Sequence, residues 1–281
     1  MRKIRLDMLL LERGLAESRS LAQRLVMAGQ VRINGEVELR AATNVFPDVH
    51  LEVEQGPRFV SRGGEKLEAA LQAFEVDIRD HICADVGAST GGFTDCLLQH
   101  GAVKIYAIDV GQGILDWKMR QDKRVVVMEK TNARYLKCLP EAVEIITIDV
   151  SFISLKVLLP VVKNWFFTDI NTGQSSKGST IALIKPQIEA GRKQVGRSKG
   201  VIRDPVIHRQ VLMDVLGFAR QQGYIVCGLI RSPLTGPKGN VEFLTWLECS
   251  GEQIASIEEL VDSVLSGAIG GSKPTSLYSH S

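Results

Sequence analysis

Residues 82–95 constrain the fold of this chain more than any other stretch, and they read I-C-A-D-V-G-A-S-T-G-G-F-T-D. The first five residues form a short apolar run broken by one aspartate, which is typical of a buried strand, and a helical pattern follows the turn. Gly87, Gly91 and Gly92 leave room for a ligand to lie against the backbone at the carboxyl end of that strand. The stretch therefore predicts a strand, a glycine turn and a helix in an α/β domain with a Rossmann-like sheet.

The spacing of the turn argues against a dinucleotide cofactor. A dinucleotide fingerprint reads G-x-G-x-x-G, and Ser89 replaces its second glycine here, so a phosphate-free cofactor such as S-adenosylmethionine fits better. A second strand-like run, residues 104–110, contains Asp109, which is placed to hold a ribose diol. Loop and acid together favour an adenosine-type cofactor over the alternative, an ordinary βαβ unit with a glycine turn.

Length and charge favour two domains with local basic patches. The chain has 281 residues, enough for one large domain and a small one, and its net charge is only +2. Any affinity for nucleic acid must therefore come from basic segments, and residues 1–32 and 185–203 are both rich in Lys and Arg.

Cysteine spacing and hydropathy bear on metals, membranes and compartment. The five cysteines are widely separated, with no C-x-x-C pair, so we expect no metal site. An odd cysteine count, no signal peptide and no long apolar stretch predict a cytoplasmic protein that does not enter a membrane.

Residues 5–55 are expected to form a separate module. Leucines at helical spacing predict a first helix, and Ser20 with Gln23 predicts a capping box for a second. Asn34-Gly35 between alternating apolar residues indicates a hairpin. We expect a small α+β domain with arginines pointing outward from its second helix.

Three motifs in this module resemble the S4-like RNA-binding domain, which is named after a ribosomal protein. They are R-L-D-x-x-L at residues 5–10, S-R at 18–19 and G-x-V-x-I-N-G at 29–35. The alternative is a small helix-hairpin with a solvated basic face. The residues that we expect to contact RNA are Arg5, Arg19, Arg24 and Arg32.

The rest of the chain alternates strand and helix patterns, which predicts a mostly parallel sheet with helices on both faces. We expect domain boundaries at 1–55, a linker at 56–62, the large domain at 63–250 and a C-terminal tail at 251–281, with a short helix near 254–265. The further strands are expected at residues 125–128, 144–149, 181–184, 224–230 and 242–247.

Four charged residues adjoin predicted strand or helix ends and could meet at one rim of the sheet. They are Lys66, Asp149, Lys185 and Glu242. Pro186 cannot donate to a ladder, so its strand must stop and leave Lys185 at the rim. For each residue alone, a surface salt bridge is the alternative.

With these four residues, four motifs resemble the TlyA family of ribosomal RNA ribose 2′-O-methyltransferases, which joins an S4-like domain to an FtsJ-like methyltransferase domain. The motifs are the glycine stretch, S-R-G-G-x-K-L (61–67), D-V-S-F-I-S (149–154) and L-I-K-P-Q (183–187). The resemblance implies S-adenosylmethionine as cofactor and ribosomal RNA or ribosomal subunits as partner, with cytidine as the target. The residues expected at the cofactor are Asp85, Gly87, Ser89, Thr90, Gly91, Gly92, Asp109 and Asn132.

Ribose chemistry suggests roles for the four charged residues. A 2′-hydroxyl is a very weak acid, so its attack on a methyl group needs a base or a cationic neighbour. We expect Lys185 to take the proton or stabilise the oxyanion, Asp149 and Lys66 to orient it, and Glu242 to support the network. The family linker commonly has Trp where this chain has Phe59, and the loop at 168–179 is longer than usual.

Two other functions compete with the enzyme. A membrane-active, haemolysin-like protein would need a long apolar or strongly amphipathic helix, which is not evident in the sequence. A non-catalytic RNA-binding assembly factor would not need the four charged residues, and all four are present.

Overall fold

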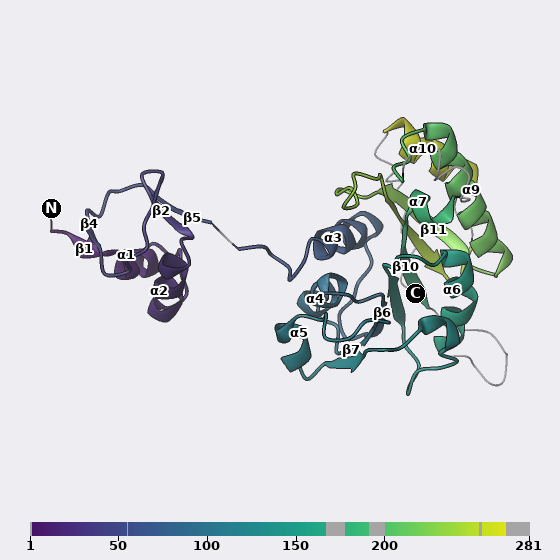
Figure 1. Ribbon diagram of the computed structural model, residues 1–281, viewed down its shortest axis with the longest axis horizontal. Helices are drawn as coiled ribbons and strands as arrows, with labels where there is room; N and C mark the ends of the chain where they lie inside the picture. Colours follow the sequence, from purple (N-terminus) through teal and green to yellow (C-terminus); the bar gives the residue numbers. More distant parts are fainter. Residues whose placement is uncertain (1, 55, 167–177, 191–199, 253–254, 268–281) are drawn as a thin grey trace, which may run out of the picture. The chain divides into compact units, whose positions relative to one another are not determined.

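The chain forms two compact units, residues 1–58 and 59–281, and each is described by itself. The computed structural model describes residues 2–54, 56–166, 178–190, 200–252 and 255–267 (Figure 1). The basic residues of segment 191–199, most of the expected long loop and the end of the expected tail lie outside these ranges.

The N-terminal unit packs two short helices on small antiparallel sheets. Its elements are β1 (Ile4–Arg5), α1 (Leu6–Glu12), α2 (Arg19–Met27), β2 (Val31–Ile33), β3 (Glu36–Val37), β4 (Asn44–Val45) and β5 (Leu51–Val53). Leu6, Leu10 and Val26 are fully buried in its core. The β2–β3 hairpin turns at Asn34 and Gly35, which both have positive φ (52° and 89°), so the expected hairpin is confirmed.

The expected capping box of the second helix is wrong. Helix α2 begins two residues early: Ser18, not Ser20, is its N-cap and accepts a hydrogen bond from the Leu21 N–H. Gln23 instead donates to Asp7, so its side chain serves tertiary packing rather than the helix end.

The second unit is built on a seven-stranded sheet in the order β11-β12-β10-β9-β6-β7-β8. The strands are β6 (Ile82–Val86), β7 (Lys104–Ile108), β8 (Val125–Met128), β9 (Ile145–Ile148), β10 (Ser179–Ile184), β11 (Ile225–Arg231) and β12 (Phe243–Glu248). β12 runs antiparallel to both of its neighbours, and the pairs from β10 to β8 are parallel, so the expected mostly parallel sheet is confirmed.

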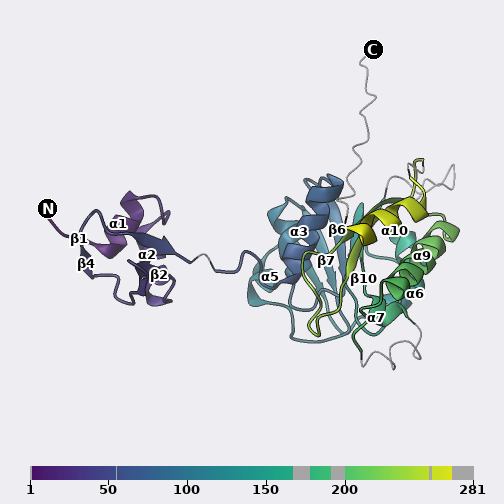
Figure 2. The same cartoon turned by 90° about the horizontal axis from the view of Figure 1, so that it is seen from above.

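Helices cover both faces of this sheet (Figures 1 and 2). One face carries α3 (Gly63–Phe74), α4 (Gly92–Gln99) and α5 (Trp117–Gln121), whose buried residues form one core cluster. The other carries α6 (Leu155–Val162), α9 (Pro205–Gln221) and α10 (Ile257–Ser266). Shorter elements are η1 (Ala133–Tyr135), η2 (Lys163–Trp165) and α7 (Pro186–Glu189).

Strand order reverses at β6, because the chain continues to β7 and β8 on one side and to β9 and β10 on the other. The carboxyl ends of β6 and β9 therefore face a topological switch point, where open α/β sheets bind their ligands.

Two expected domain limits differ from the structure. Phe59 is 3% exposed within the second unit, and the Val60 N–H donates to Asp95 Oδ2 (2.8 Å), so the second half of the predicted linker belongs to the large unit. Ile257 and Val261 of α10 are buried in the core, so residues 257–266 of the expected tail are part of the fold. Within the described ranges, no helix is long and apolar enough to cross a membrane.

Candidate active site

The glycine turn is shaped by tight packing between chain segments. Gly87 and Gly91 have positive φ (86° and 95°), where a side chain would be strained. A Cβ at Gly87 would collide with the Asp149 carbonyl oxygen, and one at Gly91 with Met119 and Leu115. Glycine is therefore required at both positions for two reasons: the positive φ, and the neighbouring protein atoms that leave no room for a side chain.

A cavity of about 300 Å³ opens beside this turn at the ends of β6, β7 and β9. Four of the expected cofactor residues line it: Gly87, Ser89, Asp109 and Asn132. Asp109 Oδ2 accepts the Ser89 N–H (2.9 Å) and its Oδ1 accepts the Gly111 N–H (2.7 Å). The carboxylate thus fixes the turn and, because each oxygen has a second lone pair, can still accept from a ligand hydroxyl.

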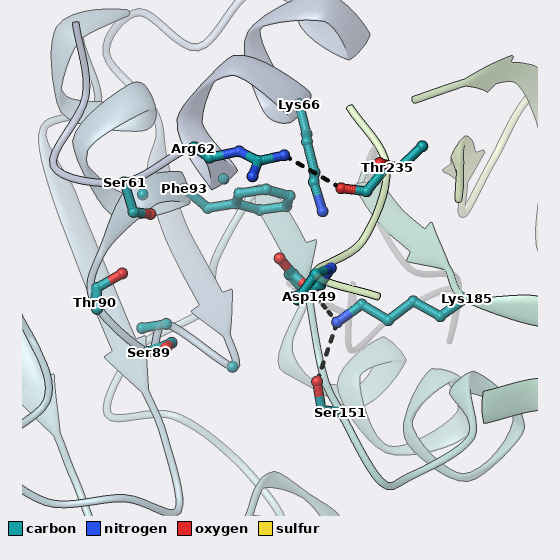
Figure 3. Close-up of a pocket in the computed structure, with 15 residues that line it drawn as sticks. Ser61, Arg62, Lys66, Ser89, Thr90, Phe93, Asp149, Ser151, Lys185 and Thr235 are labelled. Carbon is teal, nitrogen blue, oxygen red and sulfur yellow. Dashed lines mark hydrogen bonds and ion pairs between the residues drawn. The ribbon is translucent and has the colours of Figure 1, made fainter. Parts of the chain in front are cut away.

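A second cavity of about 380 Å³ adjoins the first and contains three of the four charged residues, Lys66, Asp149 and Lys185 (Figure 3). Thr90 and Gly92 also line it. The two cavities share Gly87, Ser89, Asp149 and Ser151. A group bound in one cavity can therefore meet a group bound in the other at this common wall.

The four charged residues form two ion pairs. Lys185 Nζ lies 2.6 Å from Asp149 Oδ1, and Lys66 Nζ lies 2.6 Å from Glu242 Oε2. In Figure 3 the side chains of Lys66 and Lys185 both point toward Asp149. The sheet places Lys185 after β10, Asp149 after β9 and Glu242 before β12, while Lys66 comes from the first turn of α3.

Asp85 and Gly91 line neither cavity. Asp85 is fully buried behind the turn, where Thr94 Oγ1 (2.6 Å) and Thr147 Oγ1 (3.1 Å) donate to it. Burial raises the pKa of Asp85 to about 7, and these two hydroxyl donors oppose the rise. Asp85 is therefore not placed to contact the cofactor directly, because its buried carboxyl bonds to Thr94 and Thr147 behind the turn.

Several residues that line the two cavities were not expected from the sequence. Ser151 accepts a hydrogen bond from Lys185 Nζ (3.2 Å), and the Arg62 guanidinium donates to the Thr235 carbonyl (3.4 Å) across the opening. Phe152, in the first cavity's lining, is 98% exposed and has φ 73°, a rare conformation for a bulky residue. Ser151 and Phe152 belong to D-V-S-F-I-S and Arg62 to S-R-G-G-x-K-L, so the motifs contained them although their roles were missed.

In the N-terminal unit, the buried Asp7 pairs with two of the arginines that were expected to contact RNA. Arg5 donates through Nε and Nη2 to Asp7, and Arg19 Nε lies 3.1 Å from Asp7 Oδ2. These bonds, the largest of them from Arg5, hold the pKa of Asp7 well below its usual range. Arg19 is exposed on α2, as expected, and 51% of its side chain remains accessible although it pairs with Asp7.

The other two expected arginines lie at the surface of the same unit. Arg32 Nε lies 2.7 Å from Glu54 Oε1, with about a third of its side chain exposed, and Arg24 is exposed on α2.

The sheet order, the glycine turn and the two adjoining cavities define an α/β domain with a ligand site at its topological switch point. The FtsJ-like methyltransferase family matches residues 59–249, and the S4 domain family matches residues 4–47. The chain belongs to the TlyA family of FtsJ-like methyltransferases, as its curated relatives show.

Three relatives cover nearly the whole chain. The Bacillus subtilis protein YqxC is 49% identical over 89% of this chain and 88% of its own length. TlyA of Mycobacterium tuberculosis, a 16S/23S rRNA (cytidine-2′-O)-methyltransferase, is 42% identical over 94% of this chain and 96% of its own. A solved structure of a hemolysin-named Streptococcus thermophilus protein is 41% identical, with a TM-score of 0.68 over 95% of this chain and 97% of that one.

Proposed function

We propose that this protein is a cytoplasmic methyltransferase that uses S-adenosylmethionine to methylate a cytidine ribose 2′-hydroxyl of ribosomal RNA. The observation that carries the proposal is the Lys185–Asp149 ion pair at the wall between the two cavities. Its RNA specificity is supported by the S4 domain and by the activity named for the Mycobacterium tuberculosis relative.

The residues of the first cavity fit an adenosine-type cofactor. Val86, Ile108 and Leu158 give it an apolar lining, and Asp109 supplies a carboxylate that suits a ribose diol. Asn132 adds an amide that can pair with a base edge. When bound, S-adenosylmethionine supplies a sulfonium methyl group as the electrophile.

The second cavity has the charges that an attacking hydroxyl needs. An ammonium already paired with a carboxylate suits the stabilisation of a developing oxyanion better than proton removal, so we assign Lys185 to the oxyanion. The hydroxyl proton then leaves to water, which reaches this wall because the Asp149 side chain is 23% exposed. Asp149 orients Lys185, while Lys66 adds a second positive charge from α3. Glu242 is 1% exposed and anchors Lys66.

The test is methyl transfer from tritiated cofactor to ribosomal subunits from a strain that lacks the protein. We expect label on a cytidine 2′-oxygen with the wild-type protein and labelling slowed by about 10²-fold with Lys185→Ala. Binding of cofactor and RNA without any transfer by the wild type would favour the assembly factor. Dye release from liposomes by the same preparation would instead favour the haemolysin.

The cofactor assignment has its own test in Asp109→Asn. The amide loses the charge on the proposed diol ligand and cannot accept both backbone N–H groups equally well. We expect affinity for S-adenosylmethionine, measured by calorimetry, to fall about tenfold. An unchanged affinity would refute Asp109 as the ribose ligand.

A further inference from the structure

Glu189 lies at the end of α7, one helical turn after Lys185, and its side chain reaches a different segment of the chain. Its Oε2 accepts the Ser154 hydroxyl (2.5 Å) and its Oε1 accepts the Leu155 N–H (2.8 Å). Ser154 is also the N-cap of α6 and accepts the Lys156 N–H (3.1 Å). The Glu189 carboxylate therefore caps the N-terminus of α6, where the helix dipole favours a negative charge.

The segment that Glu189 holds carries both side chains that contact the Lys185 ammonium. Residues 149–154 connect β9 to α6 and include Asp149 and Ser151, the two groups that contact Lys185 Nζ. The start of the segment is fixed because the Asp149 N–H donates to the Val86 carbonyl (2.9 Å). Within it, Phe152 has positive φ, so the segment needs external support to keep its shape.

The backbone of Lys185 is hydrogen-bonded to α7, the helix that carries Glu189. Its carbonyl accepts the Ile188 N–H (2.8 Å) and the Glu189 N–H (3.1 Å). The backbone of Lys185 and the segment that carries its partners are thus both anchored on α7.

We infer that Glu189 is a positioning residue of the methyl-transfer site, which holds residues 149–154 in register with Lys185 through Ser154 and Leu155. This inference rests on the proposed function for its activity readout. The carboxylate accepts its hydrogen bonds from Ser154 and Leu155, neither of which lines the second cavity, so we assign its effect to the positions of Lys185, Asp149 and Ser151. Burial raises the pKa of Glu189, and the Ser154 and Leu155 donors favour its charged form.

The experiment compares Glu189→Ala and Glu189→Gln in single-turnover transfer to ribosomal subunits, at saturating cofactor and RNA. We expect the alanine variant to lose about tenfold in rate. The glutamine variant keeps one carbonyl acceptor and gains an amide donor toward Ser154, so we expect it to stay within about threefold of wild type. Asp262→Ala is the matched control, since Asp262 of α10 pairs with Arg209 of α9 at the surface (3.0 Å) and is not among the charges that act on Glu189.

A double-mutant cycle separates positioning from general stabilisation. In a Lys185→Ala background the group to be positioned is gone, so Glu189→Ala should cost less than about twofold there. Equal losses in both backgrounds, or a wild-type rate for Glu189→Ala alone, would overturn the inference. If the alanine variant does not fold, Ser154→Ala takes its place in the cycle, with the same two outcomes.

A chemical readout works without methyl transfer. Lys185 is 11% exposed, and we expect Glu189→Ala to raise its rate of acetylation by an N-hydroxysuccinimide ester about threefold or more, because its partners separate from it. Exposed Lys118 serves as the internal reference by mass spectrometry. A wild type inactive on RNA would defeat the proposed function, while this measurement would still decide on Glu189: an unchanged Lys185 rate would refute it.

Discussion

The two ion pairs of the site have the same chemistry and nearly the same length but differ in their surroundings. In the Lys66–Glu242 pair the carboxylate is 1% exposed and receives a further hydrogen bond from Gln187 Nε2 (3.4 Å). In the Lys185–Asp149 pair the carboxylate is 23% exposed and borders both cavities.

The difference in burial suits one ion pair to a structural role and the other to contact with substrate. A buried carboxylate that loses its partner has no water to replace it, whereas a carboxylate at a cavity wall does. The first pair is therefore suited to fixing α3 against the sheet, and the second to meeting a substrate hydroxyl.

Lys66→Met breaks the buried ion pair and should have the largest effect on stability. It leaves Glu242 uncompensated, so we expect the free energy of unfolding to fall by about 3 kcal/mol, against about 1 kcal/mol for Lys185→Met. Denaturant unfolding followed by tryptophan fluorescence measures this, because Trp117, Trp165 and Trp246 all lie in the second unit. Equal losses for the two variants would remove the distinction between the pairs.

Lys185→Ala should have the largest effect on the reaction. It removes the cation that we propose lies beside the attacking oxygen and leaves the glycine turn unchanged, so single-turnover transfer should fall by about 10²-fold while cofactor affinity stays near wild type. Lys185→Arg should also be slow, because its planar guanidinium cannot reproduce the position of a compact ammonium. A rate within a few-fold of wild type for the alanine variant would reduce Lys185 to a surface charge.

Asp85 is linked to the exposed ion pair through its pKa. Burial raises that pKa most, and the charge of Asp149 raises it further. The folded-state pKa, about 7, lies above the ordinary value of 3.8, so the folded protein binds the extra proton. Asp85 therefore makes stability fall as pH rises from about 4 to about 7, by at most about 1.4 kcal/mol per unit. We expect Asp85→Asn to remove this slope in unfolding curves measured at pH 5, 6 and 7; an unaltered slope would assign it to other groups.

The sequence predicted the frame of the site better than its contacts. Strands β6 and β8 match their expected limits, since short apolar runs bounded by turn residues mark buried parallel strands. The prediction from Pro186 that the strand ends before it and leaves Lys185 at the rim agrees with the structure, where β10 ends at Ile184 and Pro186 begins α7. Pattern alone could not show which lysine pairs with which carboxylate, because Lys66 and Glu242 are brought together by α3 and β12 from distant parts of the chain.

Errors arose where side chains make specific hydrogen bonds that periodicity does not encode. Ser18 rather than Ser20 caps α2, and the bond from Arg19, which is exposed as expected, to the buried Asp7 was not foreseen. Glu189 went unnoticed for the same reason, since a carboxylate in a short helix gives no signal of the helix end that it caps elsewhere.

Ser151 offers the smallest and most selective change to the exposed pair. Its hydroxyl accepts from Lys185 Nζ at 3.2 Å, but the residue is exposed, so water can take its place in Ser151→Ala. We expect the transfer rate to fall by about fivefold, or about 1 kcal/mol, with unfolding unchanged. Ser151→Thr keeps the hydroxyl and should recover most of the rate. A loss as large as that of Lys185→Ala would mean that Ser151 itself contacts the reacting ribose, and no loss would mean that Asp149 alone holds the ammonium.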